Sequence, residues 1–326
     1  MDKPLVSIII LTYNRKDDLL ACLTSLKILD YENTETIVID NNSQDGTFEE
    51  VKKKFPNVII RRNSKNLGAD YPRNQAINIA KGKYLWFLDS DTIILNKEVL
   101  SNMVKTLEED KSIGGLGGQI LKDDNELKYW VIRDGRDDKI PMKNNKVFQY
   151  ESYYLPTCNL ITRMDLIKKI GGFDTNYFYY CEDEDLCLRI KKEGKRLLFK
   201  SDCCVLHNFS QNQRIGDYGK QYKNLLRCFI INKTPLYLLI FPFTQTRELY
   251  KSYRRLKRQH GNVKNLITLK ESEKGRFLNQ TGMFKLGLHM LGAIFKAQLW
   301  NFKNLPSTLE VRYNRPNFLK NVKEPN

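Results

Sequence analysis

The sequence lacks the features that mark a disulfide-rich chain or one that spans a membrane. Its seven cysteines include no CxxC pair, and only Cys203 and Cys204 are neighbours. This spacing argues against a zinc site and a disulfide framework, and it favours reduced thiols in the cytosol. The longest apolar candidate, 235–243, is about half of the ~18 residues that a spanning helix needs. No basic-then-apolar leader precedes the first apolar run at Val6, so we expect no secretory signal and a chain on the cytosolic side.

Acidic residues are scarce only in the last third of the chain. The formal net charge of the 326 residues is +16, yet residues 1–207 hold 32 basic and 32 acidic side chains. Residues 208–326 hold 22 basic and 6 acidic side chains, which accounts for the whole excess. We therefore predict a neutral domain over 1–210 and a basic, mainly helical C-terminal region over 211–326. No zinc-finger, helix-turn-helix or RNP-like signature accompanies the basic charge, so we expect no nucleic-acid partner.

Short apolar runs alternate with amphipathic stretches in the first hundred residues. The expected strands cover 6–11, 36–40, 58–61 and 84–88, and the expected helices cover 17–29 and 48–55. Continuous apolar strands separated by helices predict an α/β fold with a Rossmann-like, mostly parallel sheet that helices cover on both faces. Ligands of such sheets bind at the carboxyl ends of the strands.

Polar residues follow three of these strands directly. The first strand is followed by 12–15, the second by 40–46, and the strand at 84–88 by Asp89-Ser90-Asp91. Two carboxylates separated by one residue suit Mg²⁺ or Mn²⁺ bridging a diphosphate. An Asx turn at the end of a strand explains the same residues without a metal.

Several motifs occur together in an order that is typical of one family. They are 6–15, 38–47, 66–68, 73–74, 89–91, 171–174, 178–189 and 205–207. In this order they resemble the family 2 glycosyltransferases, and among them the rhamnosyltransferase-like members. The resemblance implies a GT-A fold, an inverting reaction, a UDP- or dTDP-sugar donor, and Mn²⁺ or Mg²⁺. It divides the domain into a nucleotide-sugar-binding half, 1–120, and an acceptor half, 121–210.

The resemblance also implies roles for individual residues. Those that would bind the donor are Thr12, Tyr13, Arg15, Asp40, Asp45, Asn66, Arg73, Asp89, Ser90 and Asp91. The first three would line the nucleoside pocket, and Asp40 would contact the base. Asp89, Asp91 and His207 would form the metal site, with Asp91 on the ion and Asp89 on the ion, the sugar, the ribose or a metal-bound water. Taken alone, 66–68 could be a turn that closes a helix, and His207 could be an ordinary satisfied polar residue.

One stretch departs from the family pattern. Asp70-Tyr71-Pro72 replaces the small residues that usually precede Arg73-Asn74, and Gln75 follows where small residues are frequent. The donor-sugar contacts near 70–75 therefore stay unassigned.

An inverting transfer needs a carboxylate that takes the proton of the acceptor hydroxyl. Four adjacent carboxylates at 182–185 repel one another, which should raise the pKa of at least one of them. Acidic residues also favour the first turn of a helix for structural reasons alone. By resemblance to the Glu-Asp motif of the family, we expect Asp183 to be the base and Glu182 to position the acceptor. Asp185 should serve structure by pairing with Arg189 at the i,i+4 spacing.

The basic region combines apolar and cationic segments. An aromatic-apolar knob at 237–243 precedes a basic helix at 247–258, and 283–300 is again largely apolar. Such segments suit the surface of an anionic bilayer, although they could also pack on the catalytic domain or on a second subunit of a homo-oligomer. We expect a peripheral enzyme on the inner face of the cytoplasmic membrane. Its acceptor would be a saccharide on a polyprenol diphosphate, in the synthesis of cell-surface polysaccharide.

Two other interpretations remain open at this stage. A nucleotidyltransferase can be built on a related sheet, but it usually needs an early Gly-rich, basic loop, and 12–15 is not one. A membrane-associated scaffold with a degenerate glycosyltransferase fold would bind nucleotide without turnover. The complete set of expected site residues argues against such a scaffold.

Overall fold

A computed structural model describes residues 3–121, 132–133, 136–137, 147–208, 218–233, 292 and 294–323. The chain divides into two compact units, one formed by 1–209 together with 316–326 and the other by 210–315. The first break lies next to the boundary that the charge distribution suggests. The end of the chain differs from the prediction, because the last residues group with the first unit and not with the basic region. Within the described residues, no helix has the length and apolar character needed to cross a membrane.

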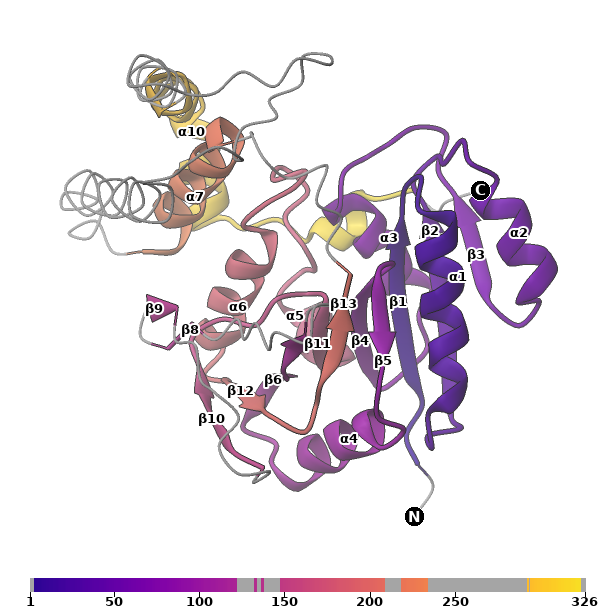
Figure 1. The fold of residues 1–326 in the computed structure, drawn as a ribbon. Helices are drawn as coiled ribbons and strands as arrows, with labels where there is room; N and C mark the ends of the chain where they lie inside the picture. Colours follow the sequence, from indigo (N-terminus) through magenta and orange to yellow (C-terminus); the bar gives the residue numbers. More distant parts are fainter. Residues whose placement is uncertain are drawn as a thin grey trace, which may run out of the picture. The chain divides into compact units, whose positions relative to one another are not determined.

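An eight-stranded sheet forms the centre of the first unit (Figure 1). In sheet order its strands are β10 (Gln149–Ser152), β12 (Arg196–Lys200), β6 (Ile113–Gly117), β11 (Asn159–Arg163), β4 (Tyr84–Asp89), β1 (Val6–Thr12), β2 (Thr34–Asp40) and β3 (Ile59–Arg62). The strands β3, β2, β1 and β4 are parallel, as predicted. The strand β11 runs antiparallel to both of its neighbours, β4 and β6, which the sequence pattern did not predict.

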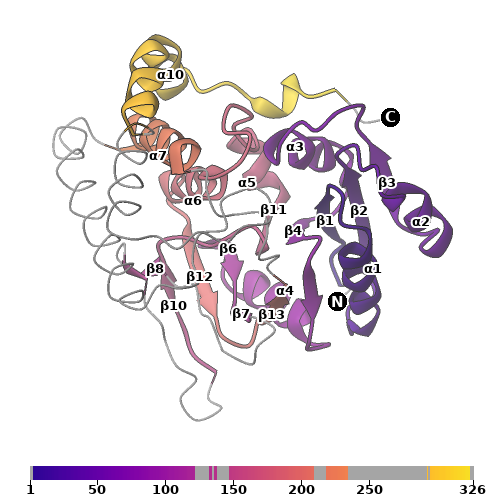
Figure 2. The ribbon, with the colours of Figure 1, turned by 45° about the horizontal axis from the view of Figure 1, so that its top comes forward.

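Helices cover both faces of the sheet. They are α1 (Lys16–Ser25), α2 (Thr47–Lys54), α3 (Asp70–Ile79), α4 (Val99–Glu109), α5 (Met164–Lys169) and α6 (Glu182–Lys192). Successive side chains of a strand point to opposite faces, so Ile8 and Ile10 join the core under α1, α2 and α4, and Ile9 joins the core under α3, α5 and α6. Figure 2 shows α3, α5 and α6 next to one another on their face of the sheet. The expected α/β architecture is confirmed.

A smaller sheet lies at the carboxyl end of β4. It contains β5 (Thr92–Ile94), β13 (Val205–His207) and β7 (Ile120–Leu121), with β13 in the middle. The antiparallel register of β13 and β5 places His207 opposite Thr92. A turn of 3-10 helix, η1 (Leu26–Ile28), follows α1, and the short strands β8 (Ile132–Arg133) and β9 (Arg136–Asp137) pair with each other. Most of the irregular segment 122–150 lies outside the described residues.

The last residues pack on α3, which explains why they belong to the first unit (Figure 1, yellow). The 3-10 helix η2 (Phe318–Asn321) buries Phe318 and Leu319, and the Asn78 amide donates to the Leu319 carbonyl at 2.9 Å. A Cβ at Gly172 would lie 2.6 Å from Leu319 Cδ2, and Gly172 has a φ of +76°. The Gly171-Gly172 motif is therefore needed where the C-terminal segment docks.

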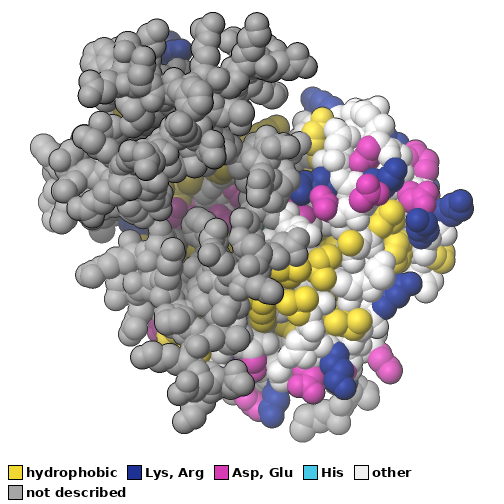
Figure 3. Space-filling view, viewed as in Figure 1, with side chains coloured by type: hydrophobic (Ala, Val, Ile, Leu, Met, Phe, Trp, Pro, Cys, Tyr) yellow, Lys and Arg dark blue, Asp and Glu magenta, His cyan; other side chains and the backbone are white. Residues whose placement is uncertain are grey.

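The described part of the second unit is helical, as expected for the C-terminal region. It contains α7 (Tyr218–Asn232), the helical residues 294–303 and α10 (Leu305–Tyr313). Arg227 on α7 donates to the Thr308 hydroxyl on α10 at 3.0 Å. The predicted knob at 237–243 and the basic run at 247–258 lie outside the described residues. On the face of the first unit drawn in Figure 3, basic and acidic side chains are interspersed, in keeping with the even charge of 1–207.

Candidate active site

The three residues predicted to bind metal come together at the carboxyl end of β4. His207 Nε2 lies 3.2 Å from Asp89 Oδ2 and 2.9 Å from Asp91 Oδ1. The Asp91 and His207 side chains are 4% and 1% exposed, whereas Asp89 is 28% exposed and leaves one side of the group open. The pairing of β13 with β5 brings His207 to this point from more than a hundred residues away.

The electrostatics of this group favour a cation. Burial by itself lowers the pKa of His207, but the hydrogen bonds and charges of Asp89 and Asp91 raise it to about 9. The two carboxylates therefore stabilise positive charge at this point. Carboxylate oxygen and imidazole nitrogen are both ligands that Mn²⁺ accepts, and the donor set therefore fits a divalent cation.

Two arginines reach the same group from other elements. Arg15, just before α1, donates to Asp91 Oδ2 at 2.9 Å. Arg73 on α3 pairs with Glu182 Oε1 at 3.0 Å and lies 3.8 Å from Asp89 Oδ1. Burial disfavours the charge of Arg73, but Glu182 and the neighbouring acids raise its pKa, so it stays cationic. Planar guanidinium groups at this edge can bind the phosphates of a donor.

Asp183, the predicted base, lies in the first turn of α6 and is partly buried. Burial and the charge of Glu182 raise the pKa of Asp183 to about 7, although a hydrogen bond from Tyr154 opposes the rise. The Tyr154 hydroxyl is 2.5 Å from Asp183 Oδ2. The raised pKa expected within 182–185 is therefore present, and a carboxyl group that titrates near neutral pH suits base catalysis.

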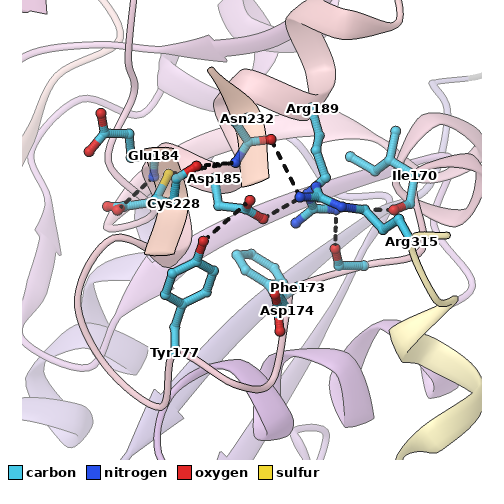
Figure 4. Close-up of polar contacts among 12 residues, drawn as sticks. Ile170, Phe173, Asp174, Tyr177, Glu184, Asp185, Arg189, Cys228, Asn232 and Arg315 are labelled. Atoms are coloured by element: carbon cyan, nitrogen blue, oxygen red, sulfur yellow. Dashed lines mark hydrogen bonds and ion pairs between the residues drawn. The ribbon is translucent and has the colours of Figure 1, made fainter. Parts of the chain in front are cut away.

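The α6 helix is anchored by a buried ion pair (Figure 4). Asp185 Oδ2 accepts from Arg189 Nε at 2.8 Å, and the two side chains are 0% and 4% exposed. Arg189 also donates to the Ile170 carbonyl at 3.0 Å and to the Gly172 carbonyl. The predicted pairing is confirmed, and it fixes the helix that carries Asp183.

Asp40, predicted to contact the base, and Asp45, predicted to bind the donor, also hold the loops together. Asp40 is fully buried, accepts from Ser43 N at 2.9 Å and lies 3.4 Å from Arg62 Nε. Asp45 accepts from Lys16 N at 2.9 Å and from the amide and hydroxyl of Thr47. These bonds connect the loops that follow β1 and β2 at their common edge.

Residues at the ends of the strands carry polar groups that a ligand could use. Thr12 is 3% exposed, and its hydroxyl has no hydrogen-bond partner in the part of the chain that the structure describes. Tyr13 is 45% exposed, while Ser90 is buried between the two aspartates. Asn66 accepts from Asn41 Nδ2 at 2.8 Å and from Gly68 N at 3.0 Å, so it shapes its own turn. The turn needs glycine, because a Cβ at Gly68 would lie 2.4 Å from the Phe178 carbonyl oxygen.

Asp70, where the sequence departs from the family pattern, is fully buried beside these groups. Burial and the charge of Glu182 raise its pKa well above the usual range. Neither carboxylate oxygen has a hydrogen-bond partner among the described residues. The buried Asp70 carboxyl group thus lies where its charged form is disfavoured, although the charge of Arg73 opposes the rise in its pKa.

Sequence reasoning missed Tyr154 and Cys158. Both precede β11, and the antiparallel register that pairs Asn159 with Leu88 carries them to the carboxyl end of β4. Ligand atoms of Asp89, Cys158 and His207 lie within 4.8 Å of one another. A sequence pattern could have located Cys158 only if the direction of β11 were known.

The mostly parallel sheet and its flanking helices form the fold that is expected for the GT-A class. The model of the family described as glycosyl transferase family 2 matches residues 7–171, about half of the chain. The chain belongs to this family. The assignment favours sugar transfer over the nucleotidyltransferase interpretation, and it leaves the rhamnosyltransferase-like detail as a prediction.

Related proteins agree with the family assignment. An uncharacterized glycosyltransferase of Methanocaldococcus jannaschii is 27% identical over 175 residues, which cover 52% of this chain and 59% of that protein. The UDP-Glc:alpha-D-GlcNAc-diphosphoundecaprenol beta-1,3-glucosyltransferase of Escherichia coli is 40% identical over 108 residues, 33% of this chain and 43% of that enzyme. The matched region thus spans about half of the length of these two relatives.

A solved structure shares the fold. The mannosyltransferase of Pyrobaculum calidifontis, in complex with GDP-Man and Mn²⁺, superimposes with a TM-score of 0.55 at 17% identity. The match covers 97% of this chain and 77% of that one. The expected GT-A fold is confirmed.

Proposed function

We propose that the protein is an inverting glycosyltransferase that moves a sugar from a UDP- or dTDP-sugar to a saccharide acceptor. The main support for the proposal is that Arg73 contacts two acidic groups, through Asp89 on one side and Glu182 on the other. One group, Asp89, Asp91 and His207, is suited to a metal diphosphate. The other contains Asp183, whose pKa is raised to about 7. Groups that would stabilise the leaving diphosphate and a base for the acceptor are thereby brought to one edge of the sheet.

On the donor side, we assign the nucleoside to the ends of β1 and β2. The buried Thr12 hydroxyl and the exposed Tyr13 ring offer a hydrogen-bonding group and a stacking surface. Arg15 and Arg73 stand where the diphosphate would lie, and their charge favours its departure. A divalent ion, Mn²⁺ or Mg²⁺, held by Asp89, Asp91 and His207 would supply Lewis-acid stabilisation of the leaving diphosphate.

On the acceptor side, Asp183 takes the proton of the attacking hydroxyl. Asp183 is partly buried as a residue, and the Tyr154 bond holds one of its carboxylate oxygens in place. Glu182 is bound to Arg73 and so sets the position of the helix turn that carries the base. We assign no separate chemical step to Glu182.

We further propose a lipid-linked saccharide as acceptor and an anionic membrane surface as the place of reaction. The name of the Escherichia coli relative includes a diphosphoundecaprenol acceptor. The basic excess of residues 208–326 would attract anionic lipid. Within 294–303, the side chains of Phe295, Leu299 and Phe302 are 66%, 43% and 75% exposed. Their i, i+4, i+7 spacing puts them on one helical face, which is a pattern of interfacial helices.

The membrane proposal predicts that the full chain sediments with anionic vesicles. Truncation near 215 is a poor test, because it also removes Phe318 and Leu319 from the first unit. The sharper variant replaces both Phe295 and Phe302 with serine. We expect reduced vesicle binding by this variant and unchanged binding by an Ile28→Ser control, because Ile28 is an apolar side chain of the first unit that is 46% exposed. Equal vesicle binding by the wild type and the double variant would show that this helical face does not bind the membrane.

The enzymatic proposal is tested by donor binding. Nucleotide-sugars are screened by thermal shift with Mn²⁺, and the donor that stabilises the protein most is then titrated calorimetrically. We expect Asp91→Asn to lose the metal-dependent part of binding, because Asp91 would hold the ion. Tight metal-dependent binding by Asp91→Asn would reject the assigned metal site. Binding without any turnover by the wild type would favour the non-catalytic scaffold.

A further inference from the structure

A cysteine stands beside the metal group and has no part in the proposed reaction. Ligand atoms of Asp89, Cys158 and His207 all lie within 4.8 Å of one another, and Asp89 Oδ2 is 3.2 Å from His207 Nε2. Cys158 is 6% exposed and His207 is 1% exposed. The partly exposed Asp89 leaves a route from solvent to this cluster.

The fold holds the three side chains on separate strand ends. Asp89 ends β4, Cys158 immediately precedes β11, and His207 ends β13. Asn159, the neighbour of Cys158, accepts from Trp86 Nε1 at 3.1 Å and donates to the Cys203 carbonyl at 2.8 Å. Both bonds are buried, so the backbone at Cys158 is fixed in register. A ligand set on paired strands is well organised before an ion arrives.

The chemistry of this set differs from that of an oxygen site. Mg²⁺ gains little from sulfur, whereas Zn²⁺ and Co²⁺ bind thiolate, imidazole and carboxylate readily. Three protein ligands with one open position are the usual arrangement of an accessible zinc site. Asp91 also contacts His207, with its Oδ1 2.9 Å from Nε2, but its other oxygen, Oδ2, is bound to Arg15 at 2.9 Å.

We propose that Asp89, Cys158 and His207 form a site for a thiophilic divalent cation such as Zn²⁺, which inhibits the enzyme by excluding the catalytic ion. The two ions exclude each other because Asp89 and His207 are ligands in the thiophilic site and in the proposed catalytic metal site. Only this part of the proposal rests on the proposed function. Binding forms a metal–sulfur bond, and the thiol proton leaves to solvent. Inhibition thus comes from occupation of the site and needs no oxidant or other co-reactant.

Cobalt is the probe, because a thiolate bound to Co²⁺ gives a charge-transfer band in the near ultraviolet. The metal-free full chain is titrated with Co²⁺ and its absorption is recorded. We expect a band that saturates at one ion per chain, is lost in Cys158→Ser and is retained in Cys204→Ser. Cys204 is a suitable control because it is half-buried and lies outside the cluster.

Zinc affinity is then measured by displacement of the bound Co²⁺. Loss of even an outer-shell partner costs about 10–100-fold in metal affinity, so removal of the sulfur ligand in Cys158→Ser should weaken Zn²⁺ at least tenfold. Absence of the band in the wild type would overturn the proposal, whether or not the variants fold. An unchanged band in a folded Cys158→Ser would overturn it as well. A band in a protein that transfers no sugar with Mn²⁺ or Mg²⁺ before any Co²⁺ or Zn²⁺ is added would support this site and reject the proposed function alone.

Discussion

The hydrogen bond from Tyr154 to Asp183 sets the pH range in which the proposed base is ionised. Burial and Glu182 raise the pKa of Asp183 to about 7, and the bond from Tyr154 limits this rise. Tyr154 remains a donor over this range, since burial raises its own pKa well above the ordinary value. The Tyr154→Phe substitution removes the bond and keeps most of the ring volume.

The size of the effect follows from the bond that is lost. A hydrogen bond to a charged group contributes about 1.5–3 kcal/mol, which corresponds to roughly one to two pKa units. The ionised fraction of Asp183 at pH 7 should then fall roughly 5- to 50-fold. The carboxylate is the active form, so activity is lost as pH falls through the pKa of Asp183. The substitution should move this loss to higher pH.

The assay is kcat/KM against pH with Mg²⁺ and the screened donor. The wild type should lose activity with a midpoint near pH 7, and Tyr154→Phe should do so at least about one unit higher. Its activity should recover toward the wild-type plateau at alkaline pH. Tyr153→Phe is the matched control, since Tyr153 is the half-buried neighbour that packs under Lys191. An equal loss at every pH, with an unmoved midpoint, would refute the reasoning.

The remaining predictions concern stability. Asp185→Asn leaves the buried charge of Arg189 without its partner, so the free energy of unfolding should fall by about 3–5 kcal/mol in urea titrations, whereas Lys54→Gln, on the exposed face of α2, should have little effect. A loss below about 1 kcal/mol for Asp185→Asn would contradict the anchoring role. Leu319→Ala should cost about 2–5 kcal/mol, because Leu319 is buried against Gly172. No change in the unfolding midpoint of the first unit would show that the last residues are not part of it.

The local pattern of the sequence predicts much of the fold. Continuous apolar runs such as 6–11 and 84–88 are typical of strands buried on both faces of a parallel sheet under helices, and these two strands are parallel neighbours in the sheet. The i,i+4 spacing predicts the Asp185–Arg189 pair because it depends on one helix alone. A raised pKa within 182–185 is also present, but burial of Asp183 contributes more to it than the repulsion among adjacent acids on which the prediction is based.

Contacts set by pairing between distant segments could not be predicted. The direction of β11 brings Tyr154 to the base and Cys158 to the metal group, and no local pattern encodes this direction. The last residues carry the same basic character as the region before them, so composition assigns them to it. They belong to the first unit instead, because Phe318 and Leu319 are buried on α3.

The most direct test of the central claim is the release of nucleoside diphosphate from the screened donor in the presence of acceptor. The wild type should release nucleoside diphosphate with Mn²⁺ or Mg²⁺, and the release should stop when the ion is chelated. Asp183→Asn should bind the donor normally but lose at least about 100-fold in rate, as expected for the loss of a general base. Asp165→Asn, an exposed acid at the start of α5, should match the wild type. Turnover by Asp183→Asn at the wild-type rate, or turnover that does not need the ion, would contradict the account.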